Sequence, residues 1–199
     1  MSSAKTRPYR MRKRAEQVAA TRQRIVDAAV RLHTTVGPAR TTISGIAEEA
    51  GVTRLTVYRH FPDAEALFSA CSEQWERDHP APDPATWRAI PDLETRAHHA
   101  LRELYAWYNE HGEALLPIYR DLHALPADER EAERAHMQQL VDALVTGTGV
   151  RGRARRHLRA AAGHAVSLWT WHSLCGEQAL DHAEGADLAA SLLIRAAKP

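Results

Sequence analysis

Several patterns on which whole protein classes depend are absent from this sequence. It holds only two cysteines, Cys71 and Cys175, and neither belongs to a Cys-x-x-Cys pair. We therefore expect no disulfide framework, and a reducing cytoplasm as the compartment. No apolar run approaches the roughly 18–20 residues of a membrane span. The basic amino terminus is not followed by the apolar core of a signal peptide. The sequence predicts a soluble, cytoplasmic protein without a membrane partner.

Motifs for catalysis and for cofactors are missing as well. There is no glycine-rich phosphate loop, no Gly-x-Ser-x-Gly elbow and no His-Glu-x-x-His motif. Among the twelve histidines, His172 lies three residues before Cys175, with His164 and His182 on either side. That spacing matches none of the usual zinc patterns. We predict that the protein is not an enzyme and holds no cofactor or metal, and we keep a metal-responsive protein as an alternative.

The residues that are abundant favour helices. Alanine, leucine, arginine and glutamate dominate, and no long alternation of polar and apolar residues indicates strands, so we predict an all-α fold. The net charge of +1 conceals an asymmetry. Residues 1–62 hold twelve Lys or Arg and four Asp or Glu, whereas residues 63–199 hold fourteen and twenty-one. A basic segment joined to an acidic body is typical of a DNA-binding module fused to a domain that does not touch DNA.

Residues 41–67 have the pattern of two short helices joined by a tight turn. Thr42 stands where it can cap the first helix. Gly51 follows that helix, at a position that needs a left-handed backbone. In the second helix, predicted over residues 53–61, Val57 and Phe61 point inward and leave the other side chains exposed. An ordinary helical hairpin has part of this spacing, but the exposed second helix is what a DNA-reading helix-turn-helix requires.

The stretch GVTRLTVYRHFPDAEAL resembles the signature of the tetracycline-repressor (TetR) family of transcriptional regulators. The matching residues are Thr42, Ile46, Ala47, Ala50, Gly51, Val52, Thr53, Thr56, Val57, Tyr58, His60, Phe61, Glu65 and Leu67. The resemblance covers residues 20–70. It implies a three-helix helix-turn-helix domain at the amino terminus and a helical ligand-binding and dimerisation domain behind it. One position departs from the pattern, because many members have a phosphate-binding lysine where this chain has Ala64.

We predict three segments: a basic flexible arm (1–20), the helix-turn-helix domain (21–67) and the helical body (68–199). The arm either contributes phosphate or minor-groove contacts or is a solvated tail, and both interpretations stay open. Its basic residues are Lys5, Arg7, Arg10, Arg12, Lys13 and Arg14. Arg22 and Arg24, in the first helix, face either the DNA backbone or solvent. In the body, we expect Gly112 to end a helix that starts at Leu93, and one long helix to run from Arg153 to Cys175.

The residues expected to contact DNA lie around the second short helix. Thr53, Arg54 and Leu55 would reach base edges, and arginine suits guanine, which offers two acceptors to its planar fork. Other side chains would hold phosphates and set the register. The full predicted set is Thr42, Thr53, Arg54, Leu55, Thr56, Tyr58, Arg59 and His60. An arginine cluster at residues 151–159 lies far from this motif, and solvation or salt bridging explains it better than a second nucleic-acid site.

The body carries more aromatic residues than we expect from packing alone. Any one of them is explained as core or dimer contact, but the resemblance implies a small-molecule pocket, which aromatic and a few polar groups would line. The predicted lining is Trp75, Trp107, Tyr108, Tyr119, His123 and Trp171.

The resemblance and the motif together predict a ligand-responsive transcriptional regulator. In its simplest form it is a repressor that binds a palindromic operator as a homodimer and is released by a small-molecule effector. Two reading heads related by a two-fold axis match the two halves of a palindrome. A sequence-indifferent architectural DNA-binding protein remains the other alternative.

Overall fold

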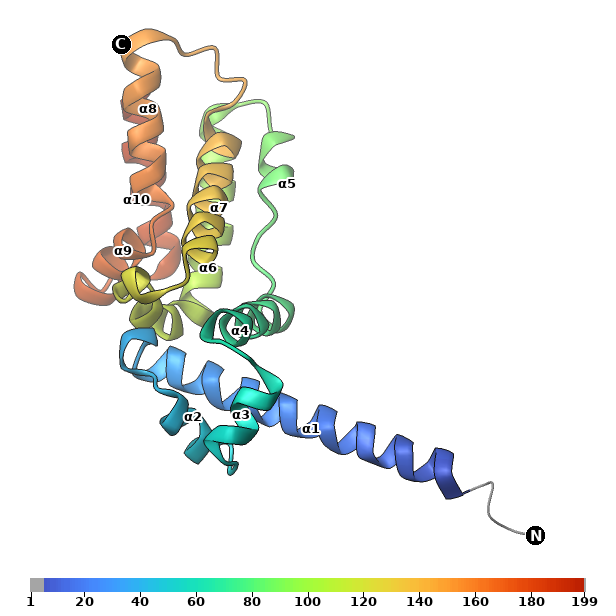
Figure 1. Cartoon of the computed structure of the whole chain (residues 1–199). Coiled ribbons are helices and arrows are strands. Elements are labelled where there is room, and N and C mark those ends of the chain that lie inside the picture. Colours follow the sequence, from blue (N-terminus) through green and yellow to red (C-terminus); the bar gives the residue numbers. More distant parts are fainter. Residues whose placement is uncertain (1–5, 199) are drawn as a thin grey trace. The chain divides into compact units, whose positions relative to one another are not determined.

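The structure is a computed structural model that describes residues 6–198, and within that range it is helical and contains no strand (Figure 1). The all-α prediction is confirmed. The elements are α1 (Thr6–Thr35), η1 (Pro38–Arg40), α2 (Ile43–Glu49), α3 (Arg54–His60), α4 (Ala64–Asp78), α5 (Pro84–Arg88), α6 (Leu93–Arg120), η2 (Leu122–Ala124), α7 (Ala127–Val145), α8 (Gly152–Ala165), α9 (Leu168–Trp171), the π-helical turn η3 (His172–Glu177) and α10 (His182–Ala196). None of the described helices is both long and apolar enough to cross a membrane.

The chain divides into two compact units, which we name the head and the body. The head comprises residues 1–78 and 117–126, and the body comprises residues 79–116 and 127–199. The boundary that we predicted after residue 67 differs from this division. Leu67, Ala70 and Cys71 of α4 are buried in the same core as α1, α2 and α3, so α4 belongs to the head.

The head core is built on α1, which packs against α2 and α4, while α2 packs against α3. Ile25 and Ala28 of α1 and Val57 of α3 have no exposed surface. The small Ala47 on α2 is also buried, which lets a neighbouring helix approach closely. Buried apolar side chains of this kind are the main stabilising contribution to such a domain.

We expected a flexible basic arm over residues 1–20, whereas the described part of that segment, residues 6–20, is helical. From Thr6 onward the chain is part of α1 and runs without a break into the head. Between Arg10 and Ala20 there is no glycine or proline, and most residues are strong helix formers. Pro8 lies in the first turn, where a missing N–H breaks no helical bond. Lys5 lies outside the described residues.

Gly112 does not end a helix, because α6 continues through it to Arg120. The side chain that explains the glycine is Trp171, which comes from far along the sequence. A Cβ atom built on Gly112 would lie 2.5 Å from Cζ3 of that indole, much closer than van der Waals contact allows. The glycine therefore provides space for a ring within the body and has no role as a helix stop.

The single long helix predicted from Arg153 to Cys175 is interrupted. α8 ends at Ala165, Ser167 caps the short α9, and η3 follows. Two tyrosines of α6 take the carbonyl groups at this break. The Tyr105 hydroxyl donates to the Ala165 oxygen (3.1 Å), and the Tyr108 hydroxyl donates to the Val166 oxygen (2.9 Å). Carbonyl groups at a helix end need partners when they are buried, and these hydroxyls supply them.

Arg96 is the buried cation of the body, with 2% of its surface exposed. Its guanidinium donates only to backbone carbonyl groups, those of Ile90, Pro91, Ala143, Leu144 and Thr146. Three of these lie at the carboxyl end of α7, where the partial negative charge of a helix favours a cation. One side chain thus ties the end of α7 to the start of α6.

Candidate functional site

Local hydrogen bonds shape the α2–turn–α3 segment. The sequence predicted the Thr42 cap and the turn at Gly51, but it placed Thr53 inside the second helix, whereas Thr53 is the residue that caps it. The Thr42 side chain accepts a bond from the Gly45 N–H (3.0 Å) and caps α2. Gly51 has φ of 63°, the left-handed conformation that the turn needs. The Thr53 side chain then accepts a bond from the Thr56 N–H (3.2 Å) and caps α3.

The outer face of α3 presents a mixed set of side chains to solvent. Leu55 is 70% exposed and Tyr58 is 45% exposed, and both are large apolar groups on an otherwise polar surface. Arg54 and Arg59 are exposed beside them, while Thr56 and His60 are half-buried. All seven predicted residues from Thr53 to His60 therefore belong to one short segment, and Thr42 lies at the start of the preceding helix.

The structure separates the roles of the residues at the start of α3. The hydroxyl groups of Thr53 and Thr56 lie 2.9 Å apart and share a hydrogen bond. Because Thr53 also caps the helix, its oxygen is already engaged within the protein. Arg54 takes part in no hydrogen bond or ion pair within residues 6–198. Its guanidinium fork and the Leu55 side chain are the two groups that are free to meet a partner here.

A cationic group from α1 joins the end of α3. The Arg22 guanidinium lies 4.7 Å from the centre of the Phe61 ring, in the geometry of a cation–π contact. Burial, with the charges of Arg59 and Arg22, lowers the pKa of His60. His60 is therefore neutral at pH 7 and can donate one hydrogen bond without adding charge. From the sequence, Arg22 was either a DNA contact or a solvated side chain. In the structure it lies close to His60, one of the residues predicted to contact DNA.

Comparisons with known proteins agree with this geometry. Residues 25–71 match the family model of bacterial regulatory proteins, tetR family. This amino-terminal segment is therefore similar to the DNA-binding part of TetR-family regulators. The chain is 45% identical to the HTH-type transcriptional regulator AcrR of Shigella flexneri over 65 residues. This aligned stretch is 33% of this chain and 29% of that protein. Over 69 residues the chain is 39% identical to TtgR of Pseudomonas putida, 35% of this chain and 33% of that protein.

The sequence likeness to these TetR-family regulators thus covers about a third of their length, whereas the likeness of fold extends further. A TetR-like transcriptional regulator from Rhodococcus sp. RHA1 aligns with 89% of this chain and 95% of its own, with a TM-score of 0.63 and 18% identity. A putative fatty acid metabolism regulator of Clostridium perfringens aligns with 86% of this chain and 97% of its own, with a TM-score of 0.60 and 17% identity. At such identities the match establishes the fold alone.

The six residues predicted to line an effector pocket are divided between the two units. Trp75, Tyr119 and His123 belong to the head. Trp107, Tyr108 and Trp171 lie together in the body, where the Tyr108 ring centre is 5.6 Å from that of Trp107 and 5.9 Å from that of Trp171. Burial raises the pKa of the Tyr108 phenol, which donates to the Val166 carbonyl. The sequence analysis missed His172, which lies beside Trp171 with ring centres 6.3 Å apart.

Three nitrogen atoms of this aromatic cluster are buried and have no hydrogen-bond partner among residues 6–198. They are Nε1 of Trp107, Nε1 of Trp171 and Nδ1 of His172. A buried polar group without a partner costs about 1–3 kcal/mol, so such groups mark places where water or a ligand binds. An indole N–H can only donate, so two of the three atoms require an acceptor. The π-helical turn η3 begins at His172, and π-helical turns are frequent at functional sites.

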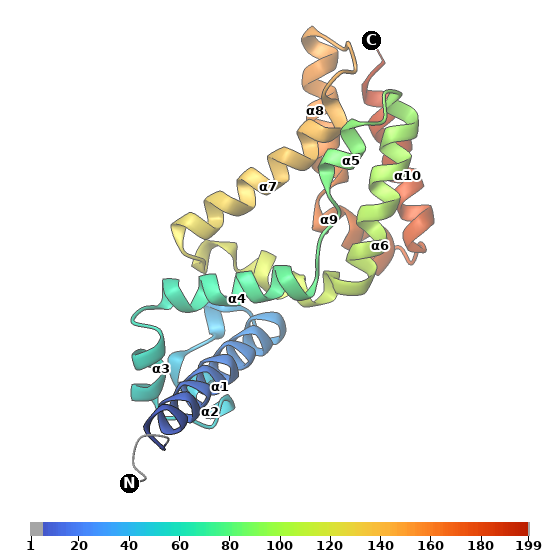
Figure 2. The same cartoon turned by 90° about the vertical axis from the view of Figure 1, so that its right-hand side faces the viewer.

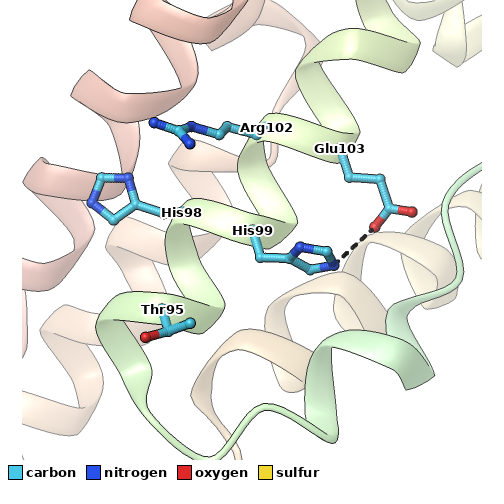
Figure 3. A pocket seen from close by; sticks show the side chains of 5 residues that line it. All are labelled: Thr95, His98, His99, Arg102 and Glu103. Carbon is cyan, nitrogen blue, oxygen red and sulfur yellow. Dashed lines mark ion pairs between the residues drawn. The ribbon is translucent and has the colours of Figure 1, made fainter.

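A second surface feature of the body is a hollow of about 530 Å³ along α6, shown in Figure 3. His98 and Arg102 point to one side of it, and both bind Asp187 of α10 (2.9 Å from His98 Nδ1, 2.6 Å from Arg102 Nη2). On the other side, Glu103 lies near His99 and accepts a bond from the Trp87 indole (2.7 Å). Arg102 and Asp187 form an ion pair, and Glu103 accepts a hydrogen bond from a neutral indole. Within residues 6–198, no three His, Cys, Asp or Glu side chains are grouped as metal ligands.

Proposed function

We propose that this protein is a TetR-family transcriptional regulator that binds a palindromic DNA operator as a homodimer and is released by a small-molecule effector. The observation that carries the proposal is the outer face of α3, where Arg54 and Leu55 are exposed at the start of a capped helix and have no partner among residues 6–198. The first residues of a recognition helix are the ones that reach base edges in the major groove. The curated relatives of the head are themselves transcriptional regulators, which favours this role over an enzymatic one.

The contacts divide into base readers and phosphate holders. Arg54 has a free guanidinium fork, which suits the two acceptors of guanine. Tyr58, Arg59 and the neutral His60 lie further along α3 and would donate to phosphate oxygens, as would the Thr42 hydroxyl at the start of α2. Ala64 is exposed and provides no charge, so the phosphate contact made by lysine in many relatives has to come from elsewhere.

The homodimer is supported by an apolar surface on the body. α8 and α10 pack against each other, and on α10 Leu188 and Leu192 remain 42% and 55% exposed. On α8 the exposed Ala160 and the half-buried Gly163 are small, which allows a partner helix to come close. The four helices contributed by two copies would bury these residues. A symmetric dimer would then place two heads on two half-sites.

The effector site that we propose is the aromatic cluster around Trp171. A planar or aromatic molecule that carries hydrogen-bond acceptors would stack on these rings and satisfy the indole N–H groups of Trp107 and Trp171. The effector releases DNA if it binds more tightly to the conformation in which the two heads no longer match the two half-sites.

The test is selection of genomic fragments by the purified full-length protein at near-physiological salt. The wild type is expected to enrich a short palindrome. Arg54→Ala is expected to lose the preference at one base pair of each half-site, whereas Tyr58→Phe should weaken binding to all sequences alike. Enrichment of fragments without a shared sequence would contradict the proposal and favour the architectural alternative. Equal behaviour of the two variants would contradict the division into base and phosphate contacts.

A further inference from the structure

The amino-terminal half of α1 extends past the rest of the head. Figure 1 shows α1 running beyond α2 and α3 towards its amino-terminal end. The side chains of residues 9–20 are all exposed, and the first fully buried residue of the helix is Ile25. An isolated helix of about 12 residues is marginally stable in water, so a segment of this kind gains stability when a partner covers it.

The projecting segment continues the face by which α1 packs in the head. Met11, Val18 and Ile25 are spaced by seven residues, which places them on one side of the helix. Ile25 has no exposed surface, whereas Val18 is 50% exposed and Met11 is 68% exposed. The apolar stripe is therefore covered within the head and uncovered beyond it.

The charge of the projecting segment indicates what kind of partner would cover it. Residues 9–24 contain one acidic side chain, Glu16, which is bonded to Arg12 (2.9 Å). The same residues contain six basic ones: Arg10, Arg12, Lys13, Arg14, Arg22 and Arg24. A second copy of this segment would bring like charges together, which opposes pairing between copies. A polyanion matches it, and the head already presents a DNA-reading helix.

We propose that residues 9–20 of α1 form a helical arm that binds DNA phosphates beyond the base pairs that α3 reads. This inference rests on the proposed function, because it assumes that the head binds DNA. Arg10, Lys13 and Arg14 are spaced by three and four residues, so they lie on one side of the helix and follow one phosphate strand. Met11 and Val18 lie against sugar carbons at the groove edge. The arm supplies the positive charge that Ala64 does not.

The length of the arm determines how many additional base pairs of DNA each head would cover. Twelve helical residues span about 18 Å, at about 1.5 Å per residue. That distance corresponds to roughly five base-pair steps of about 3.4 Å. Each head therefore protects additional backbone on the outer side of its half-site, without adding any sequence preference there.

The experiment is a salt titration of binding to a fluorescein-labelled duplex of arbitrary sequence, about 30 base pairs or three helical turns long. It compares the full-length wild type with Arg10→Gln/Lys13→Gln/Arg14→Gln. Each phosphate contact contributes about 0.9 to the slope of log affinity against log salt. The variant removes three contacts per protomer, so it is expected to reduce the magnitude of the slope by about 2–3 per protomer, or about 5 for the homodimer. Arg151→Gln/Arg153→Gln/Arg156→Gln removes the same charge from exposed positions of the body and should leave the slope unchanged.

A second variant tests the helical form of the arm. Ala15→Pro keeps every charge but breaks the helix, because proline removes a helical bond and clashes with the preceding turn. On an operator recovered by the fragment selection, its footprint is expected to shorten by about five base pairs on each outer side, as estimated from the helical rise. A wild-type footprint for Ala15→Pro would overturn the helical arm, since a flexible tail would then suffice.

The remaining outcomes separate this inference from the proposed function. If the wild type fails to bind the duplex at about 50 mM salt, where phosphate contacts are strong, the proposed function itself fails. If the wild type binds and the triple variant has an unchanged slope, only the arm is overturned. A triple variant that changes oligomeric state in sedimentation and leaves the slope unchanged would assign the stripe to a second copy and overturn the DNA arm.

Discussion

The arginine on the reading face of α3 in the head differs from the arginines of the body in whether it has a partner within the protein. In the head, Arg54 is exposed and has no partner within the described part of the chain. In the body, Arg96 is buried and donates to five carbonyl groups, and the exposed Arg102 binds both carboxylate oxygens of Asp187. Asp187 accordingly has a pKa lowered to about 2, first through its hydrogen bond with Arg102.

The difference shows what makes an exposed cation available for recognition. An arginine that already binds a carboxylate must lose that bond before it can bind a ligand. The body has an excess of acidic residues, and Arg102 at the hollow on α6 (Figure 3) forms an ion pair with Asp187. The head holds fourteen Lys or Arg and ten Asp or Glu, against twelve and fifteen in the body. On α3, Arg54 has no carboxylate partner among the described residues, so its charge is left for a polyanion such as DNA.

The largest expected effect tests the structural use of arginine in the body. Arg96→Met should lower the free energy of unfolding by about 3 kcal/mol or more, because it leaves several buried carbonyl groups without donors. Urea unfolding followed by circular dichroism measures it. Arg54→Met is the matched control, and it should change stability little while weakening DNA binding. Comparable stability losses in both variants would contradict the comparison.

A pH dependence of the head follows from His33. Burial of this side chain, which lies against Phe68 with ring centres 5.0 Å apart, lowers its pKa from 6.5 to about 4. The unfolded chain takes up the proton first as pH falls, so His33 contributes stability above pH 6.5 that is lost between about 6.5 and 4. The expected loss is on the order of 2–3 kcal/mol.

Urea midpoints measured at pH 7 and pH 5 check this dependence. His33→Leu, which removes the titrating group, should show a smaller fall in midpoint over that interval than the wild type. An unchanged fall would show that other groups dominate the acid sensitivity of the head. Asp121 does not contribute to the change between pH 7 and pH 5. The hydrogen bond from Arg120 is the main reason that the pKa of its carboxyl is lowered to about 2, so this group stays ionised over that interval.

Two glycines sharpen the comparison between the units. Gly112→Ala places a methyl group against Trp171 in the body and should destabilise the protein by about 1–3 kcal/mol through overpacking. Gly51→Ala meets no atom within 4 Å in the head, and its cost of about 1 kcal/mol comes from the left-handed backbone alone. Thermal unfolding measures both. Trp171→Leu should relieve part of the Gly112→Ala effect and none of the Gly51→Ala effect.

The smallest predicted effect concerns the base opposite Leu55. An exposed leucine finds an apolar partner in the major groove in the methyl group of thymine. Replacing the contacted thymine of a selected operator by uracil removes that methyl and should weaken binding about fourfold, the value of one buried methylene. The Leu55→Ala variant should bind both duplexes more nearly alike. If the wild type does not distinguish uracil from thymine at any position, Leu55 does not read a methyl group.

The local geometry of the α2–turn–α3 segment was predicted more fully than the arrangement of aromatic side chains in the body. That local geometry depends on Thr42, Gly51 and Thr53, each of which acts on backbone atoms within a few residues along the chain. Local hydrogen bonds of this kind leave a direct mark on the sequence. The aromatic cluster depends on Trp107 and Trp171, which are far apart in the chain. Of six predicted residues, three lie together, because no local pattern tells which distant aromatic side chains meet.

The sequence alone determined the helical class, the capped turn before α3 and the basic charge of the amino-terminal part. These follow from helix propensity, capping and charge, which operate over one or two turns of chain. Tertiary structure decided where α6 and α8 end and which unit contains α4. The Trp171 ring explains why a glycine, Gly112, lies inside α6, and the hydroxyl groups of two tyrosines of α6 donate to carbonyl groups at the end of α8. Those contacts join residues about sixty positions apart, and packing between such residues outweighs local preference.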